Sequence, residues 1–312
     1  MLQESHALWG AGLSVPDYVG MWEEMAECRW ARSWYSWRAL VDDDGRVLTS
    51  LKLYRPAVRL GETNGRAAAI GAVFTPRALR RRGYASTLIR ETLDEAARRG
   101  DTSALLFSDI GTGYYRAFGF TALPCEDALG SIAGAAARAP RGVTLRSMTI
   151  EDLELVSDAQ RASCASRPLA ILRDRDHWEF LLLRAATFFR RLDGSGLERR
   201  FMIASDGARP IGYLVAVLGP GEWNLREAEA FDGDPDTLAR VFHAGAAEAN
   251  ALSATTVWGW IPRTVWPLVS AWRLRAQPRQ RAIPMVRSLD GRELPGQIDT
   301  VEGAFIPYLD QF

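Results

Sequence analysis

Residues 80–85 read Arg80-Arg81-Arg82-Gly83-Tyr84-Ala85 and join an apolar run to a helix-like segment. The run Arg66–Thr75 is typical of a buried strand, and apolar residues in Tyr84–Arg99 recur at the spacing of one helix face. The first turn of a helix has unpaired N–H groups and a partial positive charge, and a glycine lets the backbone approach an anion. The stretch therefore predicts a phosphate-binding strand-to-helix junction, with an ordinary solvated basic turn as the alternative.

The segments around this junction predict an α/β domain. Upstream, the spacing of apolar residues predicts a helix over 17–30, and two strand-like runs at 34–41 and 46–54 flank a turn and predict a hairpin. Downstream, the short apolar run 104–107 is typical of a strand inside a covered sheet, and 110–118 is typical of a short helix. We therefore expect the order helix, antiparallel strands, strand, helix, strand, helix.

The second half repeats this order. Residues 128–142 are rich in Ala and Gly and predict a linker between a first domain at 1–127 and a second at 143–312. In the second domain the turn Asp232-Gly233-Asp234-Pro235 occupies the strand-to-helix junction, and its acidic residues would repel a phosphate. We expect a related α/β domain without the phosphate loop, built from strands at 143–146, 200–204, 211–218, 222–231 and 255–260 and helices at 151–164, 173–186 and 235–251.

Charge and composition exclude several classes of protein. The chain has 312 residues, with 38 basic and 38 acidic side chains, which removes the electrostatic argument for nucleic acid or a membrane surface as partner. The three cysteines are isolated, the three histidines are scattered, and the N-terminus does not resemble a signal peptide. We expect a cytoplasmic, metal-free monomer or homodimer that acts on a small molecule.

Two motifs resemble the Gcn5-related N-acetyltransferase (GNAT) superfamily. Arg80, Gly83 and Ala85 fill the specified positions of its Gln/Arg-x-x-Gly-x-Gly/Ala signature, and the stretch 114–120 is similar to its aromatic-Tyr-x-x-x-Gly-Phe helix ending. The resemblance implies a GNAT fold, with a mixed, splayed central sheet and flanking helices, followed here by a degenerate copy. It also implies an acyl-CoA-dependent N-acyltransferase that uses acetyl-CoA.

A narrower resemblance is to the fungal lysine N-acetyltransferase branch. It depends on three stretches, 73–76 (Val-Phe-Thr-Pro), 81–86 and 108–111 (Ser-Asp-Ile-Gly), and is vague outside residues 67–120. It implies acetylation of the side-chain amine of free lysine. The alternatives are another amine, such as a polyamine, an aminoglycoside or a biosynthetic intermediate, and a non-catalytic acyl-CoA sensor.

The resemblance also assigns the donor site. The strands at 67–75 and 104–108 splay apart, and the pantetheine arm pairs with the exposed edge of the first of them. The residues implied for pantetheine are Val73, Phe74 and Thr75, and those implied for the pyrophosphate are Arg80, Arg81, Arg82, Gly83, Tyr84, Ala85 and Ser86.

For the reaction, the resemblance assigns the general acid to Tyr115, which stands four residues before Gly119. A neutral phenol can donate a proton to the departing thiolate. Tyr114 is the competitor if the register slips by one residue, and packing of the helix is the structural alternative for Tyr115. Asp109 is a candidate base or, equally, the cap of the following helix.

Aromatic residues suggest where the acceptor binds. Trp34 and Trp37 lie where the superfamily builds its substrate side, and an apolar lining there would favour a neutral amine. Packing in the core is the favoured alternative for both. Ser108 is a candidate partner for a water or the substrate, although serine at a strand end is usually a turn residue.

Overall fold

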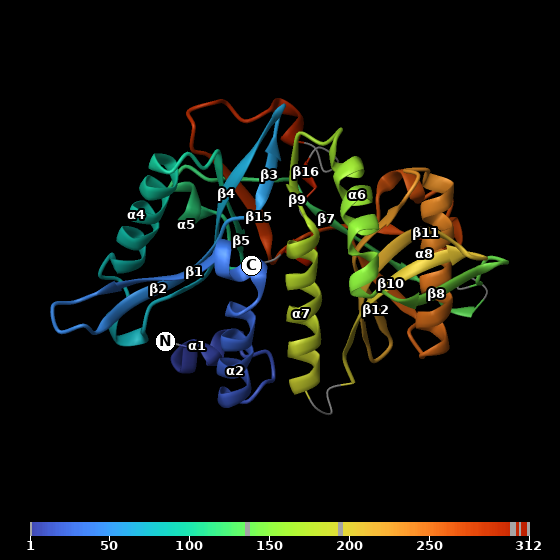
Figure 1. Cartoon of the computed structure of the whole chain (residues 1–312), viewed down its shortest axis with the longest axis horizontal. Helices are drawn as coiled ribbons and strands as arrows, with labels where there is room; N and C mark the ends of the chain where they lie inside the picture. Colours follow the sequence, from blue (N-terminus) through green and yellow to red (C-terminus); the bar gives the residue numbers. More distant parts are fainter. Residues whose placement is uncertain (1, 135–137, 193–195, 300–303, 306, 311–312) are drawn as a thin grey trace.

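The junction at residues 80–85 connects β4 (Thr63–Phe74) to α4 (Tyr84–Arg98), and β5 (Ser103–Ser108) follows α4 and runs parallel to β4 (Figure 1). This computed structural model describes residues 2–134, 138–192, 196–299, 304–305 and 307–310. One face of α4 is apolar and buried through Leu88, Ile89 and Leu93, so the helix covers one face of the sheet. The predicted β-α-β unit is therefore present.

The first sheet has the order β16-β9-β3-β4-β5-β15-β6, and β2 branches from β4 and pairs with β1. The β1–β2 hairpin and the β2–β4 pair are antiparallel, so β4–β5 is a parallel pair within a mixed sheet. Its remaining strands are β1 (Tyr35–Val41), β2 (Val47–Tyr54), β3 (Ala57–Leu60), β6 (Thr121–Ala122), β9 (Leu169–Leu172), β15 (Ile283–Ser288) and β16 (Ala304–Phe305).

The second sheet, of order β14-β7-β13-β12-β11-β10-β8, repeats the plan of the first. β12 and β13 form its parallel pair, α8 (Pro235–Ala251) connects them, and β10, β11 and β12 are antiparallel neighbours. The expected two-domain GNAT architecture is thus observed. The strands are β7 (Glu126–Ser131), β8 (Val143–Ser147), β10 (Glu198–Asp206), β11 (Arg209–Gly219), β12 (Glu222–Ala230), β13 (Thr256–Gly259) and β14 (Arg275–Pro278).

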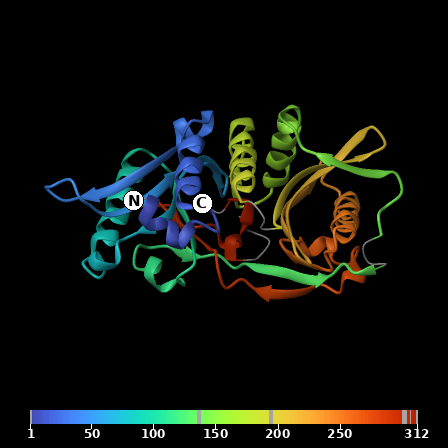
Figure 2. The same ribbon diagram turned by 90° about the horizontal axis from the view of Figure 1, so that it is seen from below.

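The two halves exchange a strand. β7, from the end of the first half, pairs with β13 in the second sheet, and β15, from the end of the second half, pairs with β5 in the first. Figure 2 shows β7 and β14 side by side and pointing in opposite directions, β7 into the second half and β14 out of it. The division at 1–127, 128–142 and 143–312 stays a prediction, but the sheets do not follow it, because β7 crosses its first boundary.

A long helix lies between the two sheets. α7 (Arg175–Arg191) stands between the halves in both views and contacts α2 (Val15–Ala26), α3 (Arg29–Trp34) and α6 (Leu153–Cys164) (Figures 1 and 2). The ring of His177 on α7 stacks on that of Trp30 on α3, with 4.2 Å between centroids. The largest apolar core therefore includes side chains from both halves. Within the described residues, no helix combines the length and apolarity needed to cross a membrane.

Several elements differ from the sequence-based expectation. The helix expected over 17–30 is two helices, because Cys28 adopts an extended conformation and accepts a hydrogen bond from Ala31 N as the cap of α3. The helix expected over 110–118 is shorter, as α5 (Gly113–Arg116). The N-terminal helix α1 (Leu2–Trp9) and the short strands β3, β6, β7, β9, β14, β15 and β16 were not predicted.

Candidate active site

The parallel strands of the first sheet separate beyond the middle of their length. Their pairing begins at Ala67 with Ser103 and ends at Ile70 with Leu106, although β4 continues to Phe74 and β5 to Ser108. The backbone edges that face each other beyond this point have no partner in a β4–β5 ladder. The splay that the fold implies is therefore present, and it opens beside the N-terminus of α4.

A bulge in β4 lies at the same place. Ser50 of β2 pairs with Phe74 of β4, and Lys52 of β2 pairs with Gly71 of β4. Two steps along β2 therefore correspond to three steps along β4. Ala72, inside the bulge, has a φ of 46°. A left-handed conformation at a non-glycine residue is strained, and such strain is often found at functional sites. The bulge shifts the register of β4 on β2, and Phe74 beyond it still pairs with Ser50.

Hydrogen bonds already occupy part of the predicted pantetheine site. The carbonyl of Phe74 accepts a hydrogen bond from Thr49 Oγ1 at 2.8 Å, and the carbonyl of Thr75 accepts one from Arg80 Nε at 3.1 Å. Val73, in the bulge, has no partner in either neighbouring ladder. Of the three predicted residues, Val73 is therefore the one whose backbone is best placed to pair with a ligand.

The predicted phosphate loop is exposed and open at the helix end. Gly83 is the N-cap of α4 with a φ of 85°, and it provides no side chain to the first helical turn. The first helical bond runs from Thr87 N to the Gly83 carbonyl, so the N–H groups of Tyr84, Ala85 and Ser86 have no helical acceptor. A Cβ atom at Gly83 would have no other atom within 4 Å, so a side chain there would have room. The glycine is favoured instead because its φ is positive, a conformation that other residues rarely adopt.

The arginines of the loop have different environments. Arg80 connects the loop to β4 through its bond to Thr75, whereas Arg81 and Arg82 are exposed. Arg81 has a φ of 63°, so the turn into the helix is tight on both sides of Arg82. The structure therefore brings two exposed cationic side chains to the open N-terminus of α4.

Tyr115 belongs to the same core cluster as Leu88 and Ile89, in the first half of α4. It is buried, with 9% of its surface exposed, and its ring packs edge-on against those of Tyr114 and Phe120. Burial, with smaller contributions from Tyr114 and Asp109, raises the pKa of Tyr115 to about 12. The phenol is therefore protonated at neutral pH, as a proton donor must be. Its neighbour Tyr114 is more exposed, and its hydroxyl lies 3.3 Å from Ser86 Oγ.

Asp109 and Ser108 form the turn after β5. Asp109 does not cap α5, whose N-cap is Thr112; its Oδ1 instead accepts a hydrogen bond from Ala282 N at 2.8 Å. Ser108 Oγ donates to the Gly111 carbonyl at 2.6 Å, the local role usual for a serine at a strand end. The Asp109 carboxylate thus fixes the turn that leads into β15, and it is exposed beside the splay.

The two predicted tryptophans have separate partners. The guanidinium of Arg66 lies over Trp34, 3.5 Å from the ring centroid. Trp37, on β1, lies near Lys52, whose Nζ is 4.9 Å from the ring centroid. The rings of Trp34 and Trp37 therefore contact different cations. Sequence reasoning missed Lys52, although a signal existed, because it is the single lysine of the chain.

The corresponding place in the second sheet is closed by its own side chains. β13 ends at Gly259, where its pairing with Leu225 of β12 also ends. The N-terminus of α8, however, is capped by Asp234, which accepts a hydrogen bond from Thr237 N at 2.9 Å. A carboxylate stands there where α4 has an open glycine. This contrast supports the prediction that only the first domain has a donor loop.

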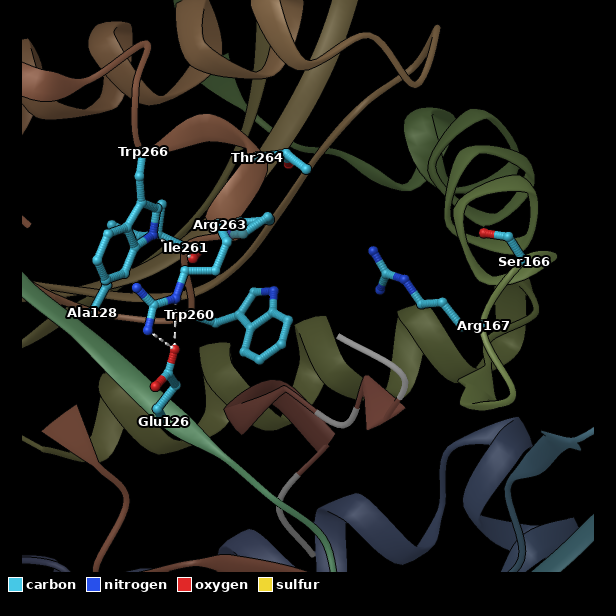
Figure 3. A pocket seen from close by; sticks show the side chains of 10 residues that line it. Glu126, Ala128, Ser166, Arg167, Trp260, Ile261, Arg263, Thr264 and Trp266 are labelled. Carbon is cyan, nitrogen blue, oxygen red and sulfur yellow. Dashed lines mark hydrogen bonds and ion pairs between the residues drawn. The ribbon is translucent and has the colours of Figure 1, made fainter. Parts of the chain in front are cut away.

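A pocket of about 230 Å³ lies just beyond β13 (Figure 3). Trp260 and Trp266 form part of its wall, and Arg263 Nε is 2.7 Å from Glu126 Oε1. Arg167, at its other side, is 3.1 Å from Glu229 of β12. The charged groups of this pocket are thus ion-paired within the protein. None of the residues predicted for the donor site lines it.

A splayed parallel pair, a bulged strand and an open glycine-capped helix beside a protonated tyrosine are features of an acyl-CoA-dependent N-acetyltransferase. Residues 2–123 match the model of the acetyltransferase (GNAT) domain family. The match concerns the domain family as a whole and does not select the fungal lysine branch. No curated protein matches the chain.

Solved structures share the fold over nearly the whole chain. A probable N-acyltransferase from Enterococcus faecalis V583 is 14% identical, with a TM-score of 0.68 over 93% of this chain and 69% of that one. GCN5-related N-acetyltransferases from Kribbella flavida (20% identity, TM-score 0.62, 93% and 69% covered) and Anabaena variabilis ATCC 29413 (16%, 0.62, 89% and 72%) are also similar. At these identities the likeness shows the fold alone.

Proposed function

We propose that the protein transfers an acetyl group from acetyl-CoA to a primary amine of a small molecule, with the side-chain amine of free lysine as the first candidate. The observation that carries this proposal is the position of Tyr115. It is a protonated, buried phenol on the helix that follows β5, next to the splay and joined through Tyr114 to the first turn of α4.

The donor would bind along β4 and at the end of α4. The pantetheine arm would pair with the β4 edge at Val73, and the pyrophosphate would accept hydrogen bonds from the N–H groups of Tyr84, Ala85 and Ser86. Arg81 and Arg82 are free to contact peripheral phosphates. With the donor bound in this way, the thioester would lie in the splay between β4 and β5.

The reaction is direct attack of the amine on the thioester carbonyl. A carbon–nitrogen bond forms, the carbon–sulfur bond breaks, and Tyr115 donates a proton to the departing sulfur. The attacking nitrogen must lose a proton, since an alkyl ammonium has a pKa of about 10.4 in water. Asp109, exposed beside the splay, is positioned to accept that proton through water.

Thiol release tests the proposal. Purified protein, acetyl-CoA and a panel of lysine, a polyamine and an aminoglycoside are expected to give free CoA with at least one amine, and lysine is expected to be the best of the three. Release with another amine and none with lysine would remove the lysine assignment. If acetyl-CoA raises the melting temperature but no amine releases thiol, the protein is a sensor and the catalytic proposal is wrong.

Substitutions in the loop test the donor site. Arg81→Ala with Arg82→Ala is expected to weaken acetyl-CoA binding about tenfold or more, because each hydrogen bond to a charged group contributes about 1.5–3 kcal/mol. Isothermal titration calorimetry measures the change. Arg98→Ala is the matched control, because Arg98 is exposed at the other end of the same helix. Equal affinity of the double variant and the control would contradict the assignment.

A further inference from the structure

The single lysine of the chain is buried. Lys52 lies on β2 with 2% of its surface exposed, and its Nζ is 2.9 Å from the ring centroid of Trp22. Trp37 and Tyr18 complete the surroundings, with centroids 4.9 and 5.8 Å from Nζ. Among the described residues, no carboxylate forms an ion pair with it. Burial without a counter-ion disfavours the charged form of an amine, so the protein itself supplies no partner for an ammonium at this position.

The groups around Lys52 are hydrogen-bond donors. Ser50 Oγ, Trp22 Nε1 and Tyr35 Oη are buried. Trp22 interacts with the Tyr18 hydroxyl and Trp37 with the Tyr35 hydroxyl, whereas Ser50 Oγ has no hydrogen-bond partner among the described residues. Burial, followed by the Arg184 guanidinium, holds the pKa of Lys52 well below its usual range. The charged side chain that affects the pKa of Lys52 is therefore another cation, Arg184. A cluster of N–H and O–H donors around an amine is suited to an anionic oxygen ligand and not to a cation.

This donor cluster flanks the splay. Ser50 and Lys52 are the two residues of β2 that pair across the β4 bulge, opposite Phe74 and Gly71. Their neighbours Leu51 and Leu53 pack in the core beneath α4, so Lys52 faces the opposite side, toward Tyr18 and Trp22 of α2. The cluster is therefore next to the part of β4 where the thioester would lie, on the face opposite α4, where α2 packs.

We infer that Lys52, supported by Ser50 and Trp22, binds a carboxylate of the acceptor, so that the acetylated amine belongs to an amino acid or another amino carboxylate. The inference deepens the proposed function and depends on it for the amine half of the substrate. A bound carboxylate would supply the counter-ion that favours the ammonium form of Lys52, and it would accept hydrogen bonds from Lys52 and Ser50. The amine end of the same molecule then extends toward the splay.

Matched amines with and without a carboxylate test the inference. With wild-type protein, 6-aminohexanoate is expected to have a kcat/KM about tenfold or more above that of hexylamine, since a charge-assisted pair contributes about 1.5–3 kcal/mol. Lys52→Met should remove this preference, chiefly by raising KM for 6-aminohexanoate. Lys52→Arg, which keeps the charge, should retain part of it. A preference that survives Lys52→Met would overturn the inference.

The control removes a cation from the same hairpin but the other face. Arg38 pairs across the ladder with Leu51 and contacts Glu95 of α4, so Arg38→Met should leave the preference for 6-aminohexanoate intact. Melting temperatures of all variants separate loss of binding from loss of folding.

Binding of hexanoate, which has no amine, separates failure of this inference from failure of the proposed function. Calorimetry should detect hexanoate with wild-type protein and Arg38→Met and not with Lys52→Met. If no amine is acetylated, the proposed function fails while this measurement still decides whether Lys52 binds a carboxylate. Equal hexanoate affinity in wild type and Lys52→Met would contradict the site directly.

Discussion

Tyr115→Phe is expected to lower the rate of thiol release about a hundredfold or more, because general acid catalysis contributes about 10²–10⁴ to such reactions. The affinity for acetyl-CoA should change little. The phenyl ring keeps the contacts of Tyr115 with Tyr114 and Phe120, so only the proton donor is lost. Stopped assays of free thiol measure the rate, and calorimetry measures the affinity.

The pH profile of the wild-type enzyme provides a second measurement. The pKa of Tyr115 is raised to about 12, so the phenol stays protonated as pH rises through 8 and 9. Loss of the acid should therefore not lower the rate in this range, and a decline should begin only as pH approaches 12. An alkaline limb centred near 9 that disappears in Tyr115→Phe would assign a much lower pKa to this residue.

Tyr114→Phe is the matched control, because Tyr114 would be the general acid if the motif were shifted by one residue. Its hydroxyl lies near Ser86 Oγ in the first turn of α4, so we expect a modest effect on donor affinity and a small one on the rate. If Tyr114→Phe lost the rate and Tyr115→Phe did not, the general acid would be Tyr114.

The local part of the fold was predictable and the exchanged strands were not. The β4-α4-β5 unit is encoded by contiguous signals, namely an apolar run, a glycine cap and a helical period. β15 and β7 are short, and each is paired with a strand from the opposite half of the chain. Sequence periodicity contains no information about such long-range partners, so neither strand was recognised.

The same distinction applies to the candidate site. The loop at Arg80–Ala85 and Tyr115 could be located because both lie in short motifs. The partner of Asp109 is Ala282 N, 173 residues away, and no local pattern predicts that bond. Lys52 appeared in the sequence as one polar residue in an apolar strand. Only the register of β2 against β4 shows that it lies beside the bulge.

A buried ion cluster connects the halves of the protein and predicts the largest effect on stability. Arg173, which directly follows β9, is paired with Glu227 of β12 at 2.6 and 2.7 Å and with Asp310 near the C-terminus at 2.6 and 2.8 Å. All three side chains are almost fully buried, and Tyr213 Oη donates to Glu227 at 2.6 Å. One guanidinium therefore pairs with two carboxylates from different parts of the chain.

Arg173→Met is expected to lower the free energy of unfolding by about 3–5 kcal/mol, because it leaves buried carboxylates without their cation. Urea unfolding followed by tryptophan fluorescence measures the loss. Arg161→Met is the matched control: its pair with Asp158 is exposed, and such pairs contribute about 0–1 kcal/mol. Losses of equal size in the two variants would show that the buried cluster contributes no more to the free energy of unfolding than an exposed ion pair.

The pH dependence of the Arg173→Met deficit distinguishes unpaired charge from lost packing. Burial raises the pKa of Asp310 even when Arg173 is present, and removing the cation raises it further. A carboxyl whose pKa is higher in the folded than in the unfolded state binds more protons when folded, so its contribution to stability increases as pH falls. The deficit should therefore shrink between pH 8 and pH 5, and adding Glu227→Gln and Asp310→Asn should recover much of it at pH 8. A deficit that is constant with pH and unchanged in the triple variant would instead assign the loss to packing of the Arg173 side chain.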